Sequence, residues 1–402
     1  MSNRNNKSRE IVQSRSAPRE TKKHAPERDS SQLIATDRRR VKGANIPNVG
    51  TPKANTPRKA PAPAPPPPQP APAPPPTQNV VPGEIPRGKN APPHLATGQL
   101  LNGKFRIEKI IGSGGFGQIY KASDEMTRLA VAIKVVPCDH EPGRMILEQK
   151  VLIMLRNTPH APHLIASGSY NGLMYIVMEM LGKNLADLRR KRKTKRLSVG
   201  TVLRAGQQAV AGLKAVHDVG YLHRDVKPSN MCIGLEGVHR RTIYIVDFGM
   251  TRQYRTGAGQ IRNARPYAGF RGTMRYVSLT VHERKEQGPV DDFWSLFYTI
   301  VELAEGSVPW KQLTDPDDIA RKKKITTYED MCRYVPKGVK EFMAHLEKLQ
   351  YHQQPNYTLL QQILQNSLPP DVSADSPFDW EENPSIVKSL SKSGKADQDT
   401  TS

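Results

Sequence analysis

Apolar and polar residues alternate between Phe105 and Lys121, on both sides of a glycine-rich turn. This alternation predicts two β-strands joined by a loop. The loop reads Gly112-Ser113-Gly114-Gly115-Phe116-Gly117, and its glycines let backbone N–H groups come close to phosphate oxygens. A dinucleotide-binding fold would need a helix directly after such a loop, whereas Ile119 to Lys121 continue as strand. We therefore predict a phosphate-binding loop between two strands.

The next pattern predicts an ion pair between a strand and a helix. Val131 to Lys134 is a short apolar run that ends in a lysine, and residues 144–156 carry apolar side chains at helical spacing. We predict that Lys134 pairs with Glu148 of this helix, with Glu141 less favoured because a proline and a glycine follow it. A lysine that ends a buried strand can also simply extend its ammonium group to water. Further predicted elements are helices at residues 184–190 and 201–219 and a strand at residues 242–246.

Candidate chemistry lies in the stretch His223-Arg224-Asp225-Val226-Lys227-Pro228-Ser229-Asn230, which is followed by Asp247-Phe248-Gly249. Transfer of the γ-phosphoryl group of ATP to a hydroxyl needs a carboxylate that accepts the proton, and oxygen ligands for magnesium. An isolated His-Arg-Asp is common and usually structural, but the complete set is specific. The predicted catalytic residues are Asp225 and Lys227, and the predicted metal ligands are Asn230 and Asp247. Lys227 favours serine or threonine hydroxyls as acceptors.

ATP and Mg²⁺ are the cofactors that this set implies. The apolar strand from Tyr175 to Met178 runs into Glu179-Met180-Leu181, whose backbone we expect to bind adenine. Met178 would lie behind the base, although a methionine there also suits plain core packing. The residues expected at the ATP site are Ile111, Gly112, Gly114, Gly115, Phe116, Gly117, Ile119, Ala132, Lys134, Glu148, Met178, Glu179 and Leu181.

Between Met250 and His282 the chain carries six arginines and no aspartate or glutamate. Guanidinium groups pair bidentately with carboxylates and phosphates, so we expect a preference for acidic or already phosphorylated substrates, with Arg271 and Arg275 as substrate-binding residues. The alternative is that these arginines are ordinary surface residues.

Composition sets the domain limits. Many of the 35 prolines lie in the first hundred residues, which also carry much of the net charge of +22. We predict a disordered, basic and Pro-rich extension at 1–97, a folded domain at 98–384 and a disordered tail at 385–402. The extension could bind an SH3- or WW-type domain or an acidic partner. Three cysteines distant in sequence and the lack of a long apolar run suggest a reducing compartment, the cytoplasm or nucleus, and no membrane span.

Several stretches resemble the casein kinase 1 superfamily, and most closely its tau-tubulin kinase branch. The stretch from Gly269 to Ser278 stands where other kinases have Ala-Pro-Glu, and residues 291–298, Pro309-Trp310 and Phe378-Asp379-Trp380 are also similar. The resemblance implies an α+β, two-lobed fold with a small β-rich N-lobe and a larger helical C-lobe, and protein substrates. It also implies that Asp292 anchors the catalytic loop. We also expect a monomer. Gly288-Pro289-Val290 departs from the basic stretch of relatives, which weakens an expectation of phospho-primed recognition.

Two other hypotheses stay open at this point. A kinase-fold scaffold would act mainly by binding partners, although loss of Lys134, Asp225 or Asp247 would have favoured it and none is lost. A basic protein that binds nucleic acid or filaments through residues 1–97 would show strongly salt-dependent binding by that extension.

Overall fold

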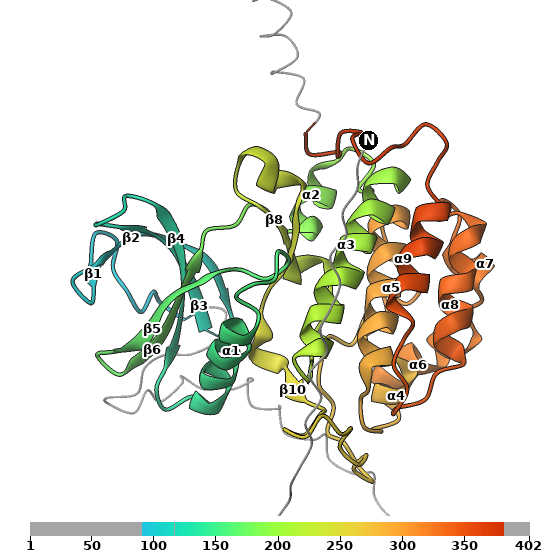
Figure 1. Ribbon diagram of the computed structural model, residues 1–402, viewed down its shortest axis with the longest axis horizontal. Coiled ribbons are helices and arrows are strands. Elements are labelled where there is room, and N and C mark those ends of the chain that lie inside the picture. The colour runs from blue at the N-terminus through green and yellow to red at the C-terminus, as the bar shows by residue number, and fades with distance from the viewer. Residues whose placement is uncertain (1–90, 116, 382–402) are drawn as a thin grey trace, which may run out of the picture. The chain divides into compact units, whose positions relative to one another are not determined.

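A computed structural model of the 402-residue chain describes residues 91–115 and 117–381. These residues form two lobes, a β-sheet lobe with one helix and a lobe built mainly of helices (Figure 1). The two-lobed α+β fold expected from the sequence is thus confirmed. The predictions for most of the extension, for the tail and for Phe116 lie outside the described residues.

The N-lobe is a six-stranded antiparallel sheet in the order β1-β2-β3-β4-β6-β5, with α1 packed beside it. Strict alternation of side chains makes β3 half-buried, as the sequence pattern predicts. Helix α1 begins two residues earlier than predicted, because Pro142 occupies its first turn, where a missing N–H costs nothing. The elements are β1 Leu100–Leu101, β2 Phe105–Gly114, β3 Gly117–Asp124, β4 Ala130–Pro137, α1 Pro142–Met154, β5 Leu164–Tyr170 and β6 Leu173–Glu179.

The C-lobe packs around α5, which is buried along nearly its whole length and contacts α3 and α8. Helix α3 in turn packs on α9, as Figure 1 shows. The helices are α2 Leu185–Lys191, α3 Val199–Asp218, α4 Leu279–His282, α5 Pro289–Glu305, α6 Pro316–Ile325, α7 Tyr328–Met331, α8 Lys340–Glu347 and α9 Tyr357–Asn366. Short 3-10 turns are η1 Pro228–Asn230, η2 Gly237–Arg241, η3 Phe248–Met250 and η4 Lys337–Val339, and short strands are β7 Tyr221–Leu222, β8 Met231–Ile233, β9 Ile243–Ile245 and β10 Arg252–Gln253.

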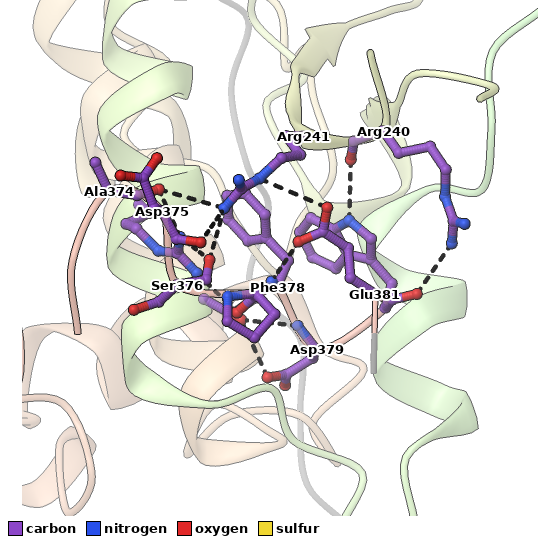
Figure 2. A network of polar contacts seen from close by, with 12 residues as sticks. Arg240, Arg241, Ala374, Asp375, Ser376, Phe378, Asp379 and Glu381 are labelled. Atoms are coloured by element: carbon purple, nitrogen blue, oxygen red, sulfur yellow. Dashed lines mark hydrogen bonds and ion pairs between the residues drawn. The ribbon is translucent and has the colours of Figure 1, made fainter. Parts of the chain in front are cut away.

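The last described residues, 374–381, form a C-terminal strap across α3 and η2 (Figure 2). Arg204 of α3 and Arg241 of η2 both donate to the Ser376 carbonyl, at 2.6 and 2.7 Å. The Phe378 ring lies under the Arg204 guanidinium, 4.0 Å from its centroid, and stacks on Trp380. Cations and aromatic rings therefore fix the strap to the C-lobe.

Asp379 of the strap completes the N-terminus of α3. Its carboxylate accepts hydrogen bonds from the Ser198 backbone N–H at 2.7 Å, the Ser198 hydroxyl at 2.6 Å and the Thr201 hydroxyl at 3.0 Å. A carboxylate at this end of a helix satisfies donors that have no partner within the helix.

No helix in the described ranges is long and apolar enough to cross a membrane.

Candidate active site

A cavity of about 1070 Å³ opens between the two lobes and brings together most of the predicted ATP-site residues. The predicted residues that line it are Ile111, Gly112, Gly114, Gly117, Ile119, Ala132, Lys134, Glu148, Met178, Glu179 and Leu181, and the predicted metal ligands Asn230 and Asp247 line it too. Gly115 lies instead beside a small adjoining hollow with His94 and His140, at the tip of the glycine-rich loop. Phe116 is not among the described residues.

Gly117 is the loop glycine whose identity the backbone requires. Its φ is +106°, and a Cβ atom there would lie 2.3 Å from the Val135 carbonyl oxygen of β4. A side chain at this position would push β3 from β4 and open the loop.

Lys134 of β4 joins two buried carboxylates. Its Nζ lies 2.7 Å from Glu148 Oε2 of α1 and 2.8 Å from Asp247 Oδ1, which confirms the predicted Lys134–Glu148 pair. Glu141 instead pairs with Arg144 at 2.8 Å. Burial alone would lower the pKa of Lys134, but the charges of Asp247 and Glu148 raise it.

The two carboxylates respond differently to the same lysine. Burial raises the pKa of Glu148 against the opposing charge of Lys134. Burial also acts to raise the pKa of Asp247, yet Lys134 holds it below its usual value. The Asp247 carboxylate is therefore the anionic group that the cavity offers to a cation.

The Asp-Phe-Gly segment brings its backbone close to this cluster. Asp247 has left-handed dihedrals, φ 67° and ψ 72°, which an L-residue adopts at a cost. A Cβ atom on Gly249 would lie 3.3 Å from Glu148 Oε2 and 3.4 Å from Asp247 Oδ1. The tight turn is what brings the Asp247 carboxylate to Lys134.

Asp225, Lys227 and Asn230 lie together on one loop that ends in η1. Lys227 Nζ lies 2.6 Å from Asp225 Oδ2, and Asn230 Nδ2 donates to the Asp225 carbonyl at 3.0 Å and to Oδ2 at 3.2 Å. Since these bonds use the amide nitrogen of Asn230, its oxygen is the atom suited to a metal ion.

Thr273 is a site residue for which the sequence predicted no role; it lies within the stretch Gly269 to Ser278. Its hydroxyl donates to Asp225 Oδ1 at 2.6 Å and accepts from Lys227 Nζ at 3.0 Å. The contact spans 48 residues of sequence, so spacing alone could not have found it.

Asp292 of α5 anchors the catalytic loop through hydrogen bonds to its backbone, which is the role that the resemblance implied. Its carboxylate is 2% exposed and accepts from the backbone N–H groups of His223 at 2.8 Å and Arg224 at 2.7 Å, and it lies 2.9 Å from His217 Nε2. Burial alone would raise its pKa, but His217 and these donors lower it. Asp292 thus fixes the backbone directly before Asp225.

Arg224 connects this loop to the segment that follows the Asp-Phe-Gly turn. Its guanidinium donates to the carbonyls of Met250 at 2.7 Å and Thr251 at 3.3 Å. Burial, reinforced by the nearby charge of Arg252, lowers the pKa of Arg224 to about 10.

The arginine-rich segment is less free than its sequence suggests. Arg252 and Arg265 both pair with the buried Glu286, which lies just beyond the acid-free stretch. Arg275 lies 3.6 Å from the buried Glu302, while Arg271 is exposed and donates to the adjacent Phe270 carbonyl. The two predicted substrate-binding arginines are therefore in different settings, and their role in substrate binding stays a prediction.

The donor set at the cavity fits magnesium. Mg²⁺ is usually held by one or two protein oxygens together with substrate phosphates, not by an all-protein cage. The facing Asn230 and Asp247 supply such oxygens. Within the described ranges no three His, Cys, Asp or Glu side chains cluster as a dedicated metal cage.

Comparison with known proteins gives the family. Residues 105–369 match the protein kinase domain. The chain is 41% identical over 288 residues to a Dictyostelium discoideum protein named "Probable serine/threonine-protein kinase", covering 71% of this chain but only 58% of that relative. It is 36% identical to a Caenorhabditis elegans protein named "Putative casein kinase I", covering 72% of this chain and 86% of the relative. It is 30% identical to the serine/threonine-protein kinase spe-6 of the same organism, covering 74% and 80%. With its cavity, ion pairs and catalytic loop in the arrangement described above, this chain belongs to the protein kinase family.

Proposed function

We propose that the protein is a serine/threonine protein kinase, which transfers the γ-phosphoryl group of ATP to hydroxyls of protein substrates. The observation that carries this proposal is the hydroxyl of Thr273, which lies 2.6 Å from Asp225 Oδ1 and 3.0 Å from Lys227 Nζ. A hydroxyl oxygen can therefore sit within reach of both the carboxylate and the ammonium group. That is the geometry needed to accept a proton and to stabilise the transferring phosphate.

The charged and polar residues of the site each have a role in this reaction. Asp225 orients the substrate hydroxyl and accepts its proton, and Lys227 offsets negative charge on the transferring phosphate. Asn230 and Asp247 would hold Mg²⁺, which neutralises phosphate charge when bound. Lys134 is kept in position by Glu148 and presents its ammonium group to the phosphates of ATP.

We further propose casein kinase 1-like activity, of the tau-tubulin kinase type, on acidic or already phosphorylated sites. The 36% identity to a protein named as a casein kinase I supports the first part. The stretch Gly269 to Ser278, together with Phe378-Asp379-Trp380 of the C-terminal strap, supports the tau-tubulin kinase type. The exposed guanidinium of Arg271 supports the third, because it can pair with an anionic side chain of the substrate.

The test is incorporation of labelled phosphate from magnesium ATP into casein and into acidic and basic peptide libraries. We expect transfer by the wild type, and loss of transfer in Asp225→Asn and Lys134→Met. We expect Asp225→Asn still to bind ATP, since Asp225 makes no part of the adenine pocket. Arg271→Ala should raise KM for acidic peptides several-fold, whereas the same change at the exposed Arg156 of the N-lobe should not.

Wild-type protein that binds ATP but transfers no phosphate would overturn the proposal and favour a scaffold. Equal transfer to acidic and basic peptides, unchanged in Arg271→Ala, would refute only the substrate preference.

A further inference from the structure

Lys323 of α6 is a buried lysine without a carboxylate partner. It is 5% exposed, and its Nζ donates to the backbone carbonyls of Met274 at 3.0 Å and Val277 at 2.5 Å. No ion pair to Lys323 is found among the residues that the structure describes. Burial of an unpaired ammonium group is expensive, so it calls for an explanation in the contacts that the group makes.

The two carbonyls belong to one loop, and Lys323 Nζ also lies 3.3 Å from Nε2 of His282 on α4. The Lys323 ammonium lies 5.1 Å from the Tyr298 ring and 5.4 Å from the Trp310 ring, at distances suited to cation–π attraction. The Trp310 indole N–H in turn donates to the Arg275 carbonyl at 2.8 Å. Lys323 and Trp310 together therefore donate hydrogen bonds to three backbone carbonyls of the loop 274–277.

This loop directly follows Thr273, whose hydroxyl lies on Asp225. Its other anchors involve side chains: Tyr276 donates to the buried Glu302, and Ser278 donates to Asp291. Lys323, like Trp310, instead holds the main chain itself, and both carbonyls that it binds lie within four residues of Thr273.

We propose that Lys323 is a positioning residue for the protein substrate: by holding the Met274 and Val277 carbonyls, it fixes the loop against which the residue next to the phosphorylated hydroxyl must lie. The inference rests on the proposed kinase function. It names a determinant of peptide binding that lies outside the ATP cavity and outside the catalytic loop.

The charge of Lys323 is sensitive to pH near neutrality. Burial lowers the pKa of Lys323 to about 7. Around it, burial together with Lys323 and Arg284 lowers the pKa of His282 on α4 to about 4, and burial raises the pKa of Tyr298 on α5. The remaining charged groups on and beside the elements packed here are Asp317, Asp318, Arg321, Lys322 and Lys324 of α6, Asp291, Asp292, Glu302 and Glu305 of α5, Glu283 and Arg284 after α4, and Arg275 of the loop.

These surroundings define how the loop should respond. Neither His282 nor Tyr298 changes charge between pH 6 and 8.5, so the change in that range falls on Lys323. The lowered pKa of Lys323 means that the ammonium group keeps its proton less well when the loop covers it than when the loop opens and exposes it to water. The neutral amine still has two N–H donors for the two carbonyls. The covered state of the loop should therefore become more stable as pH rises through about 7.

The experiment compares Lys323→Met and Lys323→Arg with Lys324→Met, a matched change at the neighbouring exposed lysine of α6. KM for an acidic peptide and KM for ATP are measured from pH 6 to 8.5. We expect Lys323→Met to raise peptide KM about tenfold at pH 8.5 with ATP KM unchanged. Wild-type peptide KM should fall as pH increases from 6 to 8.5, whereas the peptide KM of Lys323→Arg should stay flat because arginine keeps its charge.

Equal effects of Lys323→Met and Lys324→Met on peptide KM, or peptide and ATP KM that rise together, would overturn the proposal. Hydrogen exchange of the amides at 274–277 provides a second readout that needs neither turnover nor a variant. We expect wild-type exchange, corrected for intrinsic rates, to slow above pH 7 more in this loop than in α5; equal behaviour would refute the inference. If the wild type transfers no phosphate, the proposed function fails, and the exchange result still decides whether Lys323 holds the loop.

Discussion

Replacement of Asp292 by asparagine should be far more damaging than the same change at its neighbour Asp291. Both carboxyl groups are buried at the start of α5, but their partners differ. Asp292 accepts from two backbone N–H groups, which can only donate. Asp291 accepts from the Gly288 N–H and from the Ser278 hydroxyl, which can rotate to accept instead.

The magnitudes follow from these partners. In Asp292→Asn the amide nitrogen faces a backbone N–H in either orientation, that of Arg224 in one and that of His223, beside His217, in the other. A buried donor is therefore left unsatisfied, and charge-assisted hydrogen bonds are lost. The expected cost is about 3 to 5 kcal/mol of unfolding free energy. In Asp291→Asn the new amide can donate to Ser278. Burial raises the pKa of Asp291 to about 6, so at pH 5.5 asparagine replaces a mostly neutral carboxyl and should cost about 1 kcal/mol or less.

Urea unfolding of both variants at pH 5.5 measures this difference, and phosphate transfer reports the loop. Asp292→Asn should also lower kcat by at least about a hundredfold, because the backbone before Asp225 loses its anchor. Equal shifts of the two unfolding midpoints would refute the argument from donors and acceptors. A destabilised Asp292→Asn with unchanged kcat would show that the loop is held by other contacts.

Two more outcomes are expected, one for a substitution at Gly249 and one for the pH dependence of stability that Lys323 causes. Gly249→Ala places a methyl group 3.3 Å from Glu148 Oε2, so phosphate transfer should fall about tenfold while thermal unfolding shows a loss of only about 1 to 2 kcal/mol; unchanged transfer would mean that the turn relaxes. For Lys323, the unfolded state binds more protons than the folded state between pH 7 and the usual lysine range, so wild-type stability should rise with pH there. The unfolding free energy of the wild type minus that of Lys323→Met should increase by about 1 kcal/mol per pH unit between pH 7.5 and 9. The difference between the wild type and Lys324→Met, which keeps Lys323, should not change in this way.

The part of the site that the sequence predicts best is the part built within short stretches. Asp225, Lys227 and Asn230 lie on one loop, so their spacing determines their neighbourhood. Lys134 and Glu148 could be paired because helical periodicity shows which face of α1 is packed. The two lobes were expected from the family resemblance.

Contacts made by the segment after the Asp-Phe-Gly turn were beyond the sequence. Nothing in the order of residues shows that Thr273 reaches Asp225, or that Glu286 neutralises Arg252 and Arg265. The arginine count suggested a strongly basic groove, whereas the fold brings in a carboxylate from just outside the counted stretch. Nothing in the run Lys322-Lys323-Lys324 shows which lysine is buried, because the burial of Lys323 under the loop depends on how α6 packs on α4 and against the Tyr298 ring.

The C-terminal strap has a consequence for the order in which the domain is made. Ser198 is the N-cap residue of α3, and the Asp379 carboxylate that accepts its hydrogen bonds lies 181 residues later in the sequence. During synthesis, α3 emerges long before the carboxylate that completes its first turn, and α3 is the helix on which α5 and α9 assemble. A nascent chain that has reached α9 but not Asp379 therefore has a C-lobe with an unfinished central helix, and such an intermediate is a natural substrate for chaperones.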